Sequence, residues 1–405
     1  MRIAFVALLC VALAACGRPQ GVMEPIGVSV PNASLVDLLV ATTRAPAKNP
    51  AILFTGERES KVALADITVS IPPADRRQIG QVQWPSSLPP NPLTDFATVR
   101  VTPLAGVGEA RGWLKQNLPR DRRVLVFVHG FNVRFEEAVF SLAQIVHDSG
   151  AEAAPVLFTW PSRGNLFQYI YDRESTNASR DALEETLRRI ATDPSVGEVT
   201  VMAHSMGSWL VMESLRQMSI RDGRVLPKIR NVILASPDLD IDVFAAQWAE
   251  ISKPRPRLTV FSSRDDAALR ASRRLAGDVD RLGLIDPLAE PFRSELERAG
   301  VDVIDLTDLS RPGSLNHSKF AENPEIVQLL GKRLIAGQSL GGETSLGERV
   351  GGFAMGVGQT VGGVAGVAVS APLAIVDPNS RRTFDDQLKH LGDVANDTVD
   401  SARPN

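Results

Sequence analysis

The sequence predicts an α/β fold in which a mostly parallel central sheet carries helices on both faces. Short apolar runs of strand length alternate with segments of helical period through the middle of the chain. This alternation is typical of parallel strands joined by crossover helices. Neither G-x-G-x-x-G nor G-x-x-x-x-G-K-[ST] follows any of these runs, so the dinucleotide-binding and P-loop versions of such a sheet are disfavoured.

The expected elements follow one another along the chain. Residues 62–72 and 97–103 contain β-branched residues and are expected to open the sheet. The later strands are expected at residues 124–128, 154–160, 199–203, 232–235, 258–261 and 301–306. Helices are expected at residues 136–147, 178–191, 208–217, 242–251, 269–276 and 324–335.

Length and charge limit the classes of protein that fit. The 405 residues allow one large α/β domain, expected at residues 61–336, with a further segment at each end. The formal net charge of −3 is small, so the composition does not favour a nucleic-acid partner. The sequence shows no cofactor-binding or metal-binding motif, and we expect neither group.

The two cysteines, Cys10 and Cys16, both precede the expected core. The core therefore has no thiol for a disulfide, a zinc site or a cysteine nucleophile, and covalent catalysis would need a serine. Residues 1–16 combine a basic start, an apolar run too short to span a bilayer and a small-residue end. These features are typical of a bacterial secretion signal.

The end of this segment resembles a lipobox, in which the cysteine becomes the acylated first residue of the mature protein. The resemblance implies a lipid anchor at Cys16 in the cell envelope, and Gly17 in place of an aspartate favours the outer membrane. Residues 17–60 are rich in Pro, Gly, Ala and Asn and are expected to form a tether. Residues 337–405 are expected to form a Gly/Ala-rich tail, either weakly ordered or in contact with the membrane, and a short polar helix.

The sharpest local signal is the pentapeptide AHSMG at residues 203–207, which follows an apolar strand and precedes a helical segment. This arrangement is typical of a nucleophile elbow, a tight turn that lifts a serine hydroxyl above the sheet. The helix N-terminus beneath the turn stabilises developing negative charge. We therefore predict Ser205 as the nucleophile, with Ala203 standing where glycine is usual.

A second motif, FVHGFN, follows an earlier strand at residues 127–132. In hydrolases with a nucleophile elbow, the loop at this station supplies one backbone amide of the oxyanion hole, and the residue after the serine supplies the other. We predict that the backbone amides of Phe131 and Met206 hold the oxyanion.

A serine hydroxyl needs a nearby imidazole as general base, and the chain has five histidines. His129 belongs to the oxyanion loop and His204 adjoins the serine on the wrong side of the turn. His147 ends a predicted helix and His390 lies in the tail. His317 remains, in a loop after the last predicted strand, where this type of enzyme carries its base.

The acid that orients the imidazole is expected at a strand end on the same edge of the sheet. Asp266 comes soon after the strand at 258–261 and is the first candidate. Asp265 beside it and Asp238 after the preceding strand are the alternatives. Each of the three could instead cap a helix or a turn.

With these motifs in place, the sequence resembles a family of α/β hydrolases from bacterial envelopes that long lacked an assigned function. The resemblance covers residues 122–334 and includes the surroundings of Asp266 and His317. Its other matching segments are residues 127–132, 159–162, 169–175, 203–207 and 235–238. It implies the α/β-hydrolase fold and a Ser-Asp-His triad of the esterase or lipase kind, and it supplies no substrate.

The function predicted from these residues is hydrolysis of a small-molecule or lipid acyl ester through an acyl-enzyme. A phospholipid, a thioester and a peptide bond would suit the same triad. A lipid-anchored envelope protein that binds or tethers without catalysis is the alternative from another class. Four aromatic residues lie at or after the end of the strand at 154–160 and are expected either to line an acyl or aryl pocket or to pack on their own loop: Trp160, Phe167, Tyr169 and Tyr171.

Overall fold

The structure is a computed structural model that describes residues 20–28, 31–309 and 315–335. The expected secretion signal with Cys16 and the expected tail at residues 337–405 lie outside the described residues. Among the helices that are described, none combines the length and apolar character that a membrane crossing needs.

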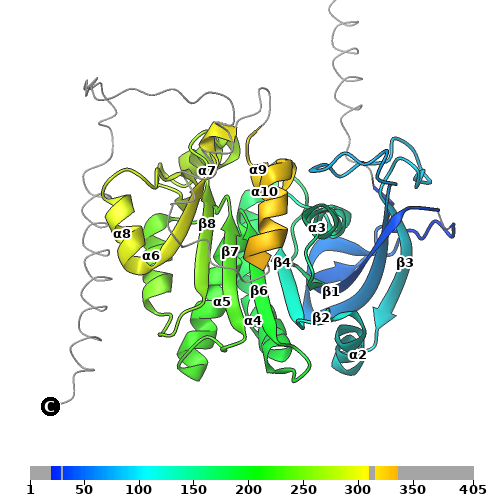
Figure 1. Cartoon of the computed structure of the whole chain (residues 1–405), viewed down its shortest axis with the longest axis horizontal. Coiled ribbons are helices and arrows are strands. Elements are labelled where there is room, and N and C mark those ends of the chain that lie inside the picture. Colours follow the sequence, from blue (N-terminus) through cyan, green and yellow to red (C-terminus); the bar gives the residue numbers. More distant parts are fainter. Residues whose placement is uncertain (1–19, 29–30, 310–314, 336–405) are drawn as a thin grey trace, which may run out of the picture.

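The strands of the described chain form a single sheet (Figure 1). They are β1 (Ser34–Pro46), β2 (Phe54–Ile71), β3 (Ala97–Leu104), β4 (Arg123–Val128), β5 (Ala154–Thr159), β6 (Glu198–His204), β7 (Ile229–Ala235), β8 (Arg257–Ser262) and β9 (Val301–Asp305). Their order across the sheet is β3-β2-β1-β5-β4-β6-β7-β8-β9. β3, β2 and β1 pair antiparallel, and every pairing from β1 through to β9 is parallel.

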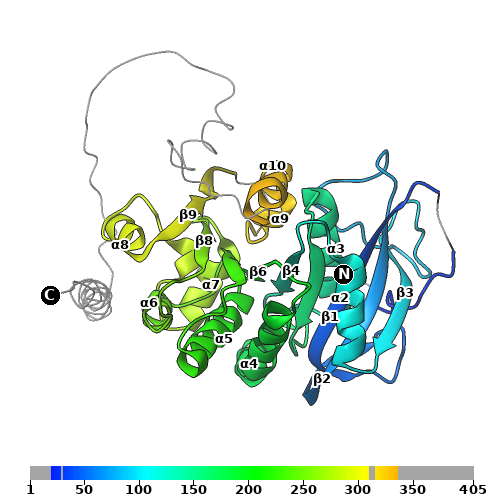
Figure 2. The same ribbon diagram turned by 60° about the horizontal axis from the view of Figure 1, so that its bottom comes forward.

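Helices cover both faces of the sheet (Figure 2). One apolar core lies beneath α2 (Val107–Asn117), α4 (Tyr169–Thr192), α5 (Gly207–Asp222) and α6 (Ile241–Ala249). The other lies beneath α3 (Phe135–Ser149), α9 (Lys319–Glu322), α10 (Pro324–Leu329) and a π-helical segment at Leu330–Ile335. The remaining elements are η1 (Leu166–Gln168), α7 (Ala267–Leu275), η2 (Leu282–Leu284), α8 (Phe292–Ala299) and η3 (Thr307–Leu309).

The two cores follow from the two-residue period of a strand, whose side chains point alternately to opposite faces. In β4, Val124 and Val126 belong to the core under α4 and α5, whereas Leu125 and Phe127 belong to the core under α3. All four are buried. A strand covered on both faces reads as a continuous apolar run, and the predicted fold class, with a mostly parallel sheet between two helical layers, is confirmed.

The predicted tether at residues 17–60 is wrong from Ser34 onward. Residues 34–46 form β1, which lies between β2 and β5, and β2 begins at Phe54 rather than at residue 62. Leu38 and Val40 are fully buried against the α3 side. The turn-forming residues on either side dominate the average composition of this stretch, and they hide the apolar strand within it.

Several helices also depart from their expected extents. α4 begins at Tyr169 instead of residue 178, so Tyr169 and Tyr171 are helical rather than part of a loop. α2 and α8 were not expected, because each is short and mostly polar. A short amphipathic helix that packs by one face gives only a weak periodic signal.

Candidate active site

Ser205 lies in a strained turn between β6 and α5. Its φ is +51°, a left-handed conformation that is unfavourable for residues other than glycine. The backbone holds the turn from both sides: the Ser205 amide donates to the Ala235 carbonyl at 2.9 Å, and the Ser208 amide donates to the Ser205 carbonyl at 3.0 Å. The sharp strand-to-helix turn expected around Ser205 is therefore present, at the carboxyl edge of the parallel strands.

Two glycines allow the turn to pack against the end of β4. A Cβ atom on Gly207 would meet the carbonyl oxygens of His129 at 2.4 Å and Val128 at 2.8 Å. A Cβ atom on Gly130 would meet the Ser205 Cβ at 2.9 Å. Side chains are thus excluded at both positions, which brings the predicted oxyanion loop directly against the serine.

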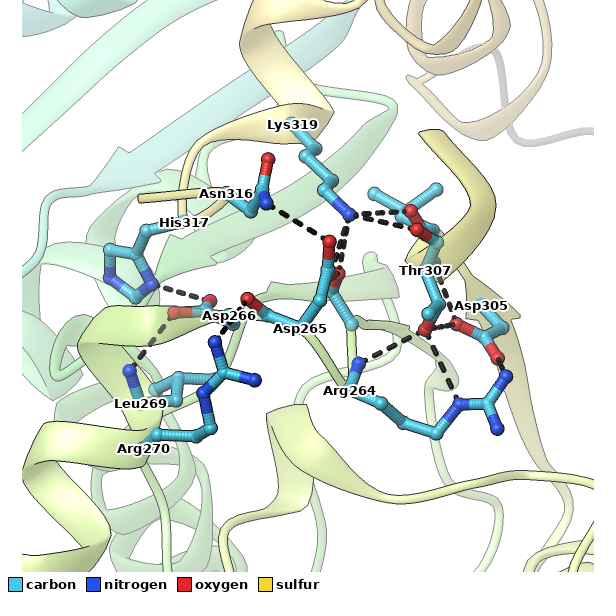
Figure 3. Close-up of polar contacts among 12 residues, drawn as sticks. Arg264, Asp265, Asp266, Leu269, Arg270, Asp305, Thr307, Asn316, His317 and Lys319 are labelled. Carbon is cyan, nitrogen blue, oxygen red and sulfur yellow. Dashed lines mark hydrogen bonds and ion pairs between the residues drawn. The ribbon is translucent and has the colours of Figure 1, made fainter. Parts of the chain in front are cut away.

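His317 and Asp266 form a close pair at the same edge of the sheet (Figure 3). The His317 Nδ1 lies 2.7 Å from the Asp266 Oδ2, and the Asp266 side chain is fully buried. Asp266 also caps α7, because its Oδ1 accepts the Leu269 amide at 2.9 Å. A carboxylate can only accept, so the imidazole carries its proton on Nδ1 and leaves Nε2 able to accept a proton.

Asp265, the neighbouring candidate acid, points away from His317 and anchors the loop that carries it (Figure 3). Its carboxylate accepts from the Lys319 Nζ at 2.6 Å and from the Asn316 Nδ2 at 3.0 Å. Lys319 is buried and also donates to the Leu306 carbonyl at 2.9 Å. Asn316, immediately before His317, and Lys319, two residues after it, are thereby attached to the ends of β8 and β9.

Asp238, the third candidate acid, has other partners. Its carboxylate accepts from the Ser272 Oγ at 2.6 Å and from the Tyr169 hydroxyl at 3.1 Å, and it forms an ion pair with Arg281 at 3.3 Å. These contacts join α4 to α7. Burial, and then the charge of Asp238, raise the pKa of Tyr169, so its hydroxyl stays a hydrogen-bond donor. Of the three candidate acids, only Asp266 is paired with His317 among the described residues.

Ser205 and His317 line one cavity of about 860 Å³. This volume lies within the range of pockets that bind small organic ligands. The wall formed by α7 is mostly small and apolar, with Ala267, Ala268 and Leu269. The cavity thus places an apolar surface next to the predicted nucleophile and base.

The backbone of the predicted oxyanion hole flanks Ser205. Phe131 lines the cavity, and Met206 stands at the N-cap of α5. Within the part of the chain that the structure describes, no protein acceptor is paired with the backbone amide of either residue. Both N–H groups therefore remain able to bind a substrate oxygen.

His129 has a structural role beneath the oxyanion loop. Its Nε2 accepts from the Arg44 guanidinium at 3.3 Å and from the Trp160 amide at 3.2 Å, so the ring proton is on Nδ1, which donates to the Gly130 carbonyl at 2.9 Å. Burial, and then the neighbouring Arg44 charge, hold the pKa of His129 well below its usual range. The ring is a neutral scaffold and not the base.

Arg44, at the end of β1, holds the two loops around the serine together. It is 1 % exposed, and it donates to the carbonyls of Val133 in the oxyanion loop and of Ser162 after β5, both at 2.8 Å. Burial lowers the pKa of Arg44 to about 10, and the nearby charge of Asp172 opposes the shift. The guanidinium thus stays charged at neutral pH.

Asp172 in the first turn of α4 holds the same loops from the other side. Its carboxylate accepts from the amides of Asn132 at 3.2 Å and Arg163 at 3.1 Å and from the Ser162 hydroxyl. Burial raises the pKa of Asp172. The oxyanion loop is therefore fixed directly after Phe131, by Asp172 at the Asn132 amide and by Arg44 at the Val133 carbonyl. The sequence reasoning missed Arg44, because it placed the residue in a tether.

We expect the substitution Arg44→Met to lower the free energy of unfolding by about 3–5 kcal/mol, because it leaves buried carbonyls and a buried carboxylate without their cation. Urea denaturation of the wild type and the variant measures the difference. Arg230→Met is the matched control, since Arg230 is exposed and lies 3.8 Å from Glu198; it should change stability by less than about 0.5 kcal/mol. A loss below about 1 kcal/mol for Arg44→Met would contradict the role of Arg44 in holding the two loops around Ser205 together.

His204, beside the serine in sequence, packs against the base. Its ring centroid lies 4.7 Å from that of His317 and 4.9 Å from that of Phe320. Burial, and then the proximity of His317, hold the pKa of His204 well below its usual range. A neutral ring in this position supports the His317 loop without adding a competing charge.

The expected aromatic pocket forms only in part. Tyr169 lines the cavity, with its ring edge-on to Phe131 at 5.2 Å. Trp160 is fully buried against His129, Tyr171 lies beneath Arg163, and Phe167 projects into solvent. In the described residues, no group of His, Cys, Asp or Glu side chains is placed to hold a metal ion.

Comparison with curated proteins finds a partial match. An uncharacterized protein of Nostoc sp., alr1448, is 29 % identical over 122 residues, which cover 24 % of this chain and 32 % of the relative. The match thus spans about a third of that relative's length, and it carries no information on activity.

Solved structures of hydrolases are similar to this chain at low sequence identity. A predicted CIB-like hydrolase from Thermoplasma acidophilum is 14 % identical, with a TM-score of 0.32 over 54 % of this chain and 88 % of its own. The RedJ thioesterase from Streptomyces coelicolor is 19 % identical, with a TM-score of 0.28 over 52 % and 85 %. An esterase from Rhizomucor miehei is 13 % identical, with a TM-score of 0.30 over 81 % and 91 %.

The family assignment comes from a match over residues 107–333, more than half of the chain. The matched region runs from α2 into the last described helical segment, Leu330–Ile335, and contains Ser205, Asp266 and His317. The chain therefore belongs to the family described as alpha/beta hydrolase of unknown function (DUF900).

Proposed function

We propose that this protein is a serine hydrolase that cleaves carboxylic acyl esters through a covalent acyl-enzyme on Ser205. The observation that carries the proposal is the hydrogen bond between His317 and the buried Asp266 at the cavity that Ser205 also lines. Buried carboxylate, imidazole and strained serine are the three parts of an acyl-transfer triad.

In the proposed mechanism, the His317 Nε2 removes the proton from the Ser205 hydroxyl as its Oγ attacks the ester carbonyl. The backbone amides of Phe131 and Met206 bind the oxyanion of the tetrahedral intermediate. His317 then gives its proton to the leaving alcohol, and the acyl group stays on Ser205. Water, activated by His317 in the same way, releases the acid, while Asp266 holds the imidazole orientation throughout.

The experiment that tests the proposal is hydrolysis of p-nitrophenyl esters of increasing acyl length by the purified full-length protein. We expect turnover, with kcat/KM rising from acetate to medium-chain esters because longer chains bury more apolar surface in the cavity. A folded protein that hydrolyses none of these esters would contradict the proposal.

The proposed lipid anchor at Cys16, an envelope location and an outer-membrane destination fall on residues outside the described part of the chain. They stay predictions of the sequence. An anchor of this kind would hold the hydrolase domain close to a membrane.

A further inference from the structure

Apolar side chains gather at the entrance of the cavity. Leu166, Leu275 and Leu315 line it, and yet each is more than half exposed. Phe167 follows Leu166 in η1 and Ile170 lies in the first turn of α4, and the five residues are between 66 % and 94 % exposed. We call these five side chains the apolar rim. Contiguous exposed apolar surface around a ligand site marks a place of contact.

The rim is held in place by polar bonds. The Asn165 side chain accepts the Phe167 amide at 2.9 Å and so caps η1. The Arg163 guanidinium donates to the Gln168 side chain at 2.8 Å. On the other side of the entrance, the Tyr169 hydroxyl lies 3.1 Å from the Ser272 Oγ, which connects α4 to α7. A fixed turn therefore presents Phe167 to solvent, with no core contact to explain its apolar side chain.

The charge next to the rim is positive. α7 carries three arginines and no acidic residue between Ala267 and Leu275. Arg270 and Arg274 are exposed on the helix that ends at Leu275, and neither lines the cavity. Guanidinium groups recognise phosphate oxygens in a bidentate manner, so the exposed arginines of α7 place phosphate-binding groups on the same short helix as the rim residue Leu275.

We propose that the apolar rim docks on a phospholipid surface and that the substrate is a lipid ester, whose acyl chain passes from that surface into the cavity. This inference rests on the proposed ester hydrolysis and names its substrate class. Phe167 and Ile170 enter the acyl layer, the α7 arginines bind headgroup phosphates, and Leu166, Leu275 and Leu315 guide the chain toward Ser205. Apolar side chains next to arginines are the composition that favours binding at a membrane interface.

Lipid docking fits these residues better than a protein partner because the rim is continuous with the cavity. A partner seated on it would close the entrance to Ser205, whereas a lipid surface supplies the substrate through the same opening. The small apolar wall formed by Ala267, Ala268 and Leu269 suits an unbranched acyl chain.

The test measures the hydrolysis rate of each protein, wild type or variant, on two substrates. The first is 4-methylumbelliferyl oleate carried in vesicles of equal parts phosphatidylglycerol and phosphatidylethanolamine, and the second is soluble 4-methylumbelliferyl butyrate. The full-length wild type is compared with the double variant Phe167→Ser, Ile170→Ser, in which neither changed residue lines the cavity. Because both carry the same N-terminus, a predicted anchor affects them equally.

We expect the double variant to lose about tenfold or more of the rate on the vesicle ester, because two apolar side chains no longer enter the lipid. Its rate on the butyrate should stay within about twofold of wild type. The control is Ile220→Ser, an exposed apolar residue near the far end of α5, about 20 Å along the helix from the serine turn. It should match wild type on both substrates.

Three results would overturn the rim inference while leaving ester hydrolysis intact. They are an unchanged vesicle rate in the double variant, an equal loss in Ile220→Ser, and a wild type that hydrolyses the butyrate but not the vesicle ester. A wild type that hydrolyses neither substrate would instead remove the proposed function on which the inference rests.

Discussion

The substitution Ser205→Ala is expected to lower kcat for ester hydrolysis by a factor of about 10⁴ to 10⁶, because no other group can form the acyl-enzyme. The change should leave stability within about 1 kcal/mol of wild type, since alanine removes one hydroxyl and keeps the backbone turn. Initial rates on p-nitrophenyl butyrate, together with urea denaturation, measure both quantities. A protein that only binds or tethers would show no change of rate, because its rate would already be at background.

The matched control for this prediction is Ser208→Ala. Ser208 lies one helical turn further along and is fully buried, and its hydroxyl has no hydrogen-bond partner among the described residues. The same chemical change at this position should leave kcat within about twofold of wild type. An equal loss in both variants would point to general damage of α5 and would contradict a specific role for Ser205.

The substitution Asp266→Asn should lower kcat by about 10⁴ with little change in structure. The asparagine oxygen can still accept the Leu269 amide and cap α7. Its amide group, however, would donate to the His317 Nδ1, which moves the imidazole proton to Nε2. His317 then has no free nitrogen to accept the serine proton. Rates on a soluble ester between pH 6 and pH 9 measure the loss.

Variants of the two rival acids give the comparison. Asp265→Asn removes the ion pair to Lys319 but keeps the carboxylate at His317. Asp238→Asn weakens the connection between α4 and α7. Each should lower kcat by about tenfold or less. If either loses as much activity as Asp266→Asn, the assignment of Asp266 as the orienting residue is contradicted.

The parts of the site that the sequence predicts are those with a local signal. Ser205 stands in a turn whose strand and helix are both visible in the sequence, and Gly130 and Gly207 are required there by close contacts. His317 is predicted by elimination among the five histidines and by its position in a loop after the last predicted strand. The roles of these residues in catalysis stay predictions until the variants are measured.

The choice between Asp265 and Asp266 could not come from the sequence, because adjacent residues share the same strand end. The direction of each side chain distinguishes the two carboxylates. Asp266 stands at the N-cap of α7, where its carboxylate lies against both the Leu269 amide and His317. Asp265 turns toward Lys319, a contact across 54 positions of the chain that no local pattern encodes.

Arg44 was missed for a related reason. Its importance depends on the position of β1 beside β5, a pairing across more than 100 residues. Because these two strands run parallel, the end of β1 reaches the edge of the sheet where the oxyanion loop lies. A single arginine after an apolar run is the only indication of this role in the sequence, and the neighbouring prolines favour an irregular segment instead.

The central claim is that Ser205 is an activated nucleophile, and labelling with a fluorophosphonate probe tests it most directly. The probe reacts with a serine only when a base and an oxyanion hole assist the attack. We expect one stoichiometric adduct on the folded full-length protein, located by mass spectrometry at Ser205 and absent from Ser205→Ala. A folded wild type that stays unlabelled, or an equal adduct in the variant, would contradict it.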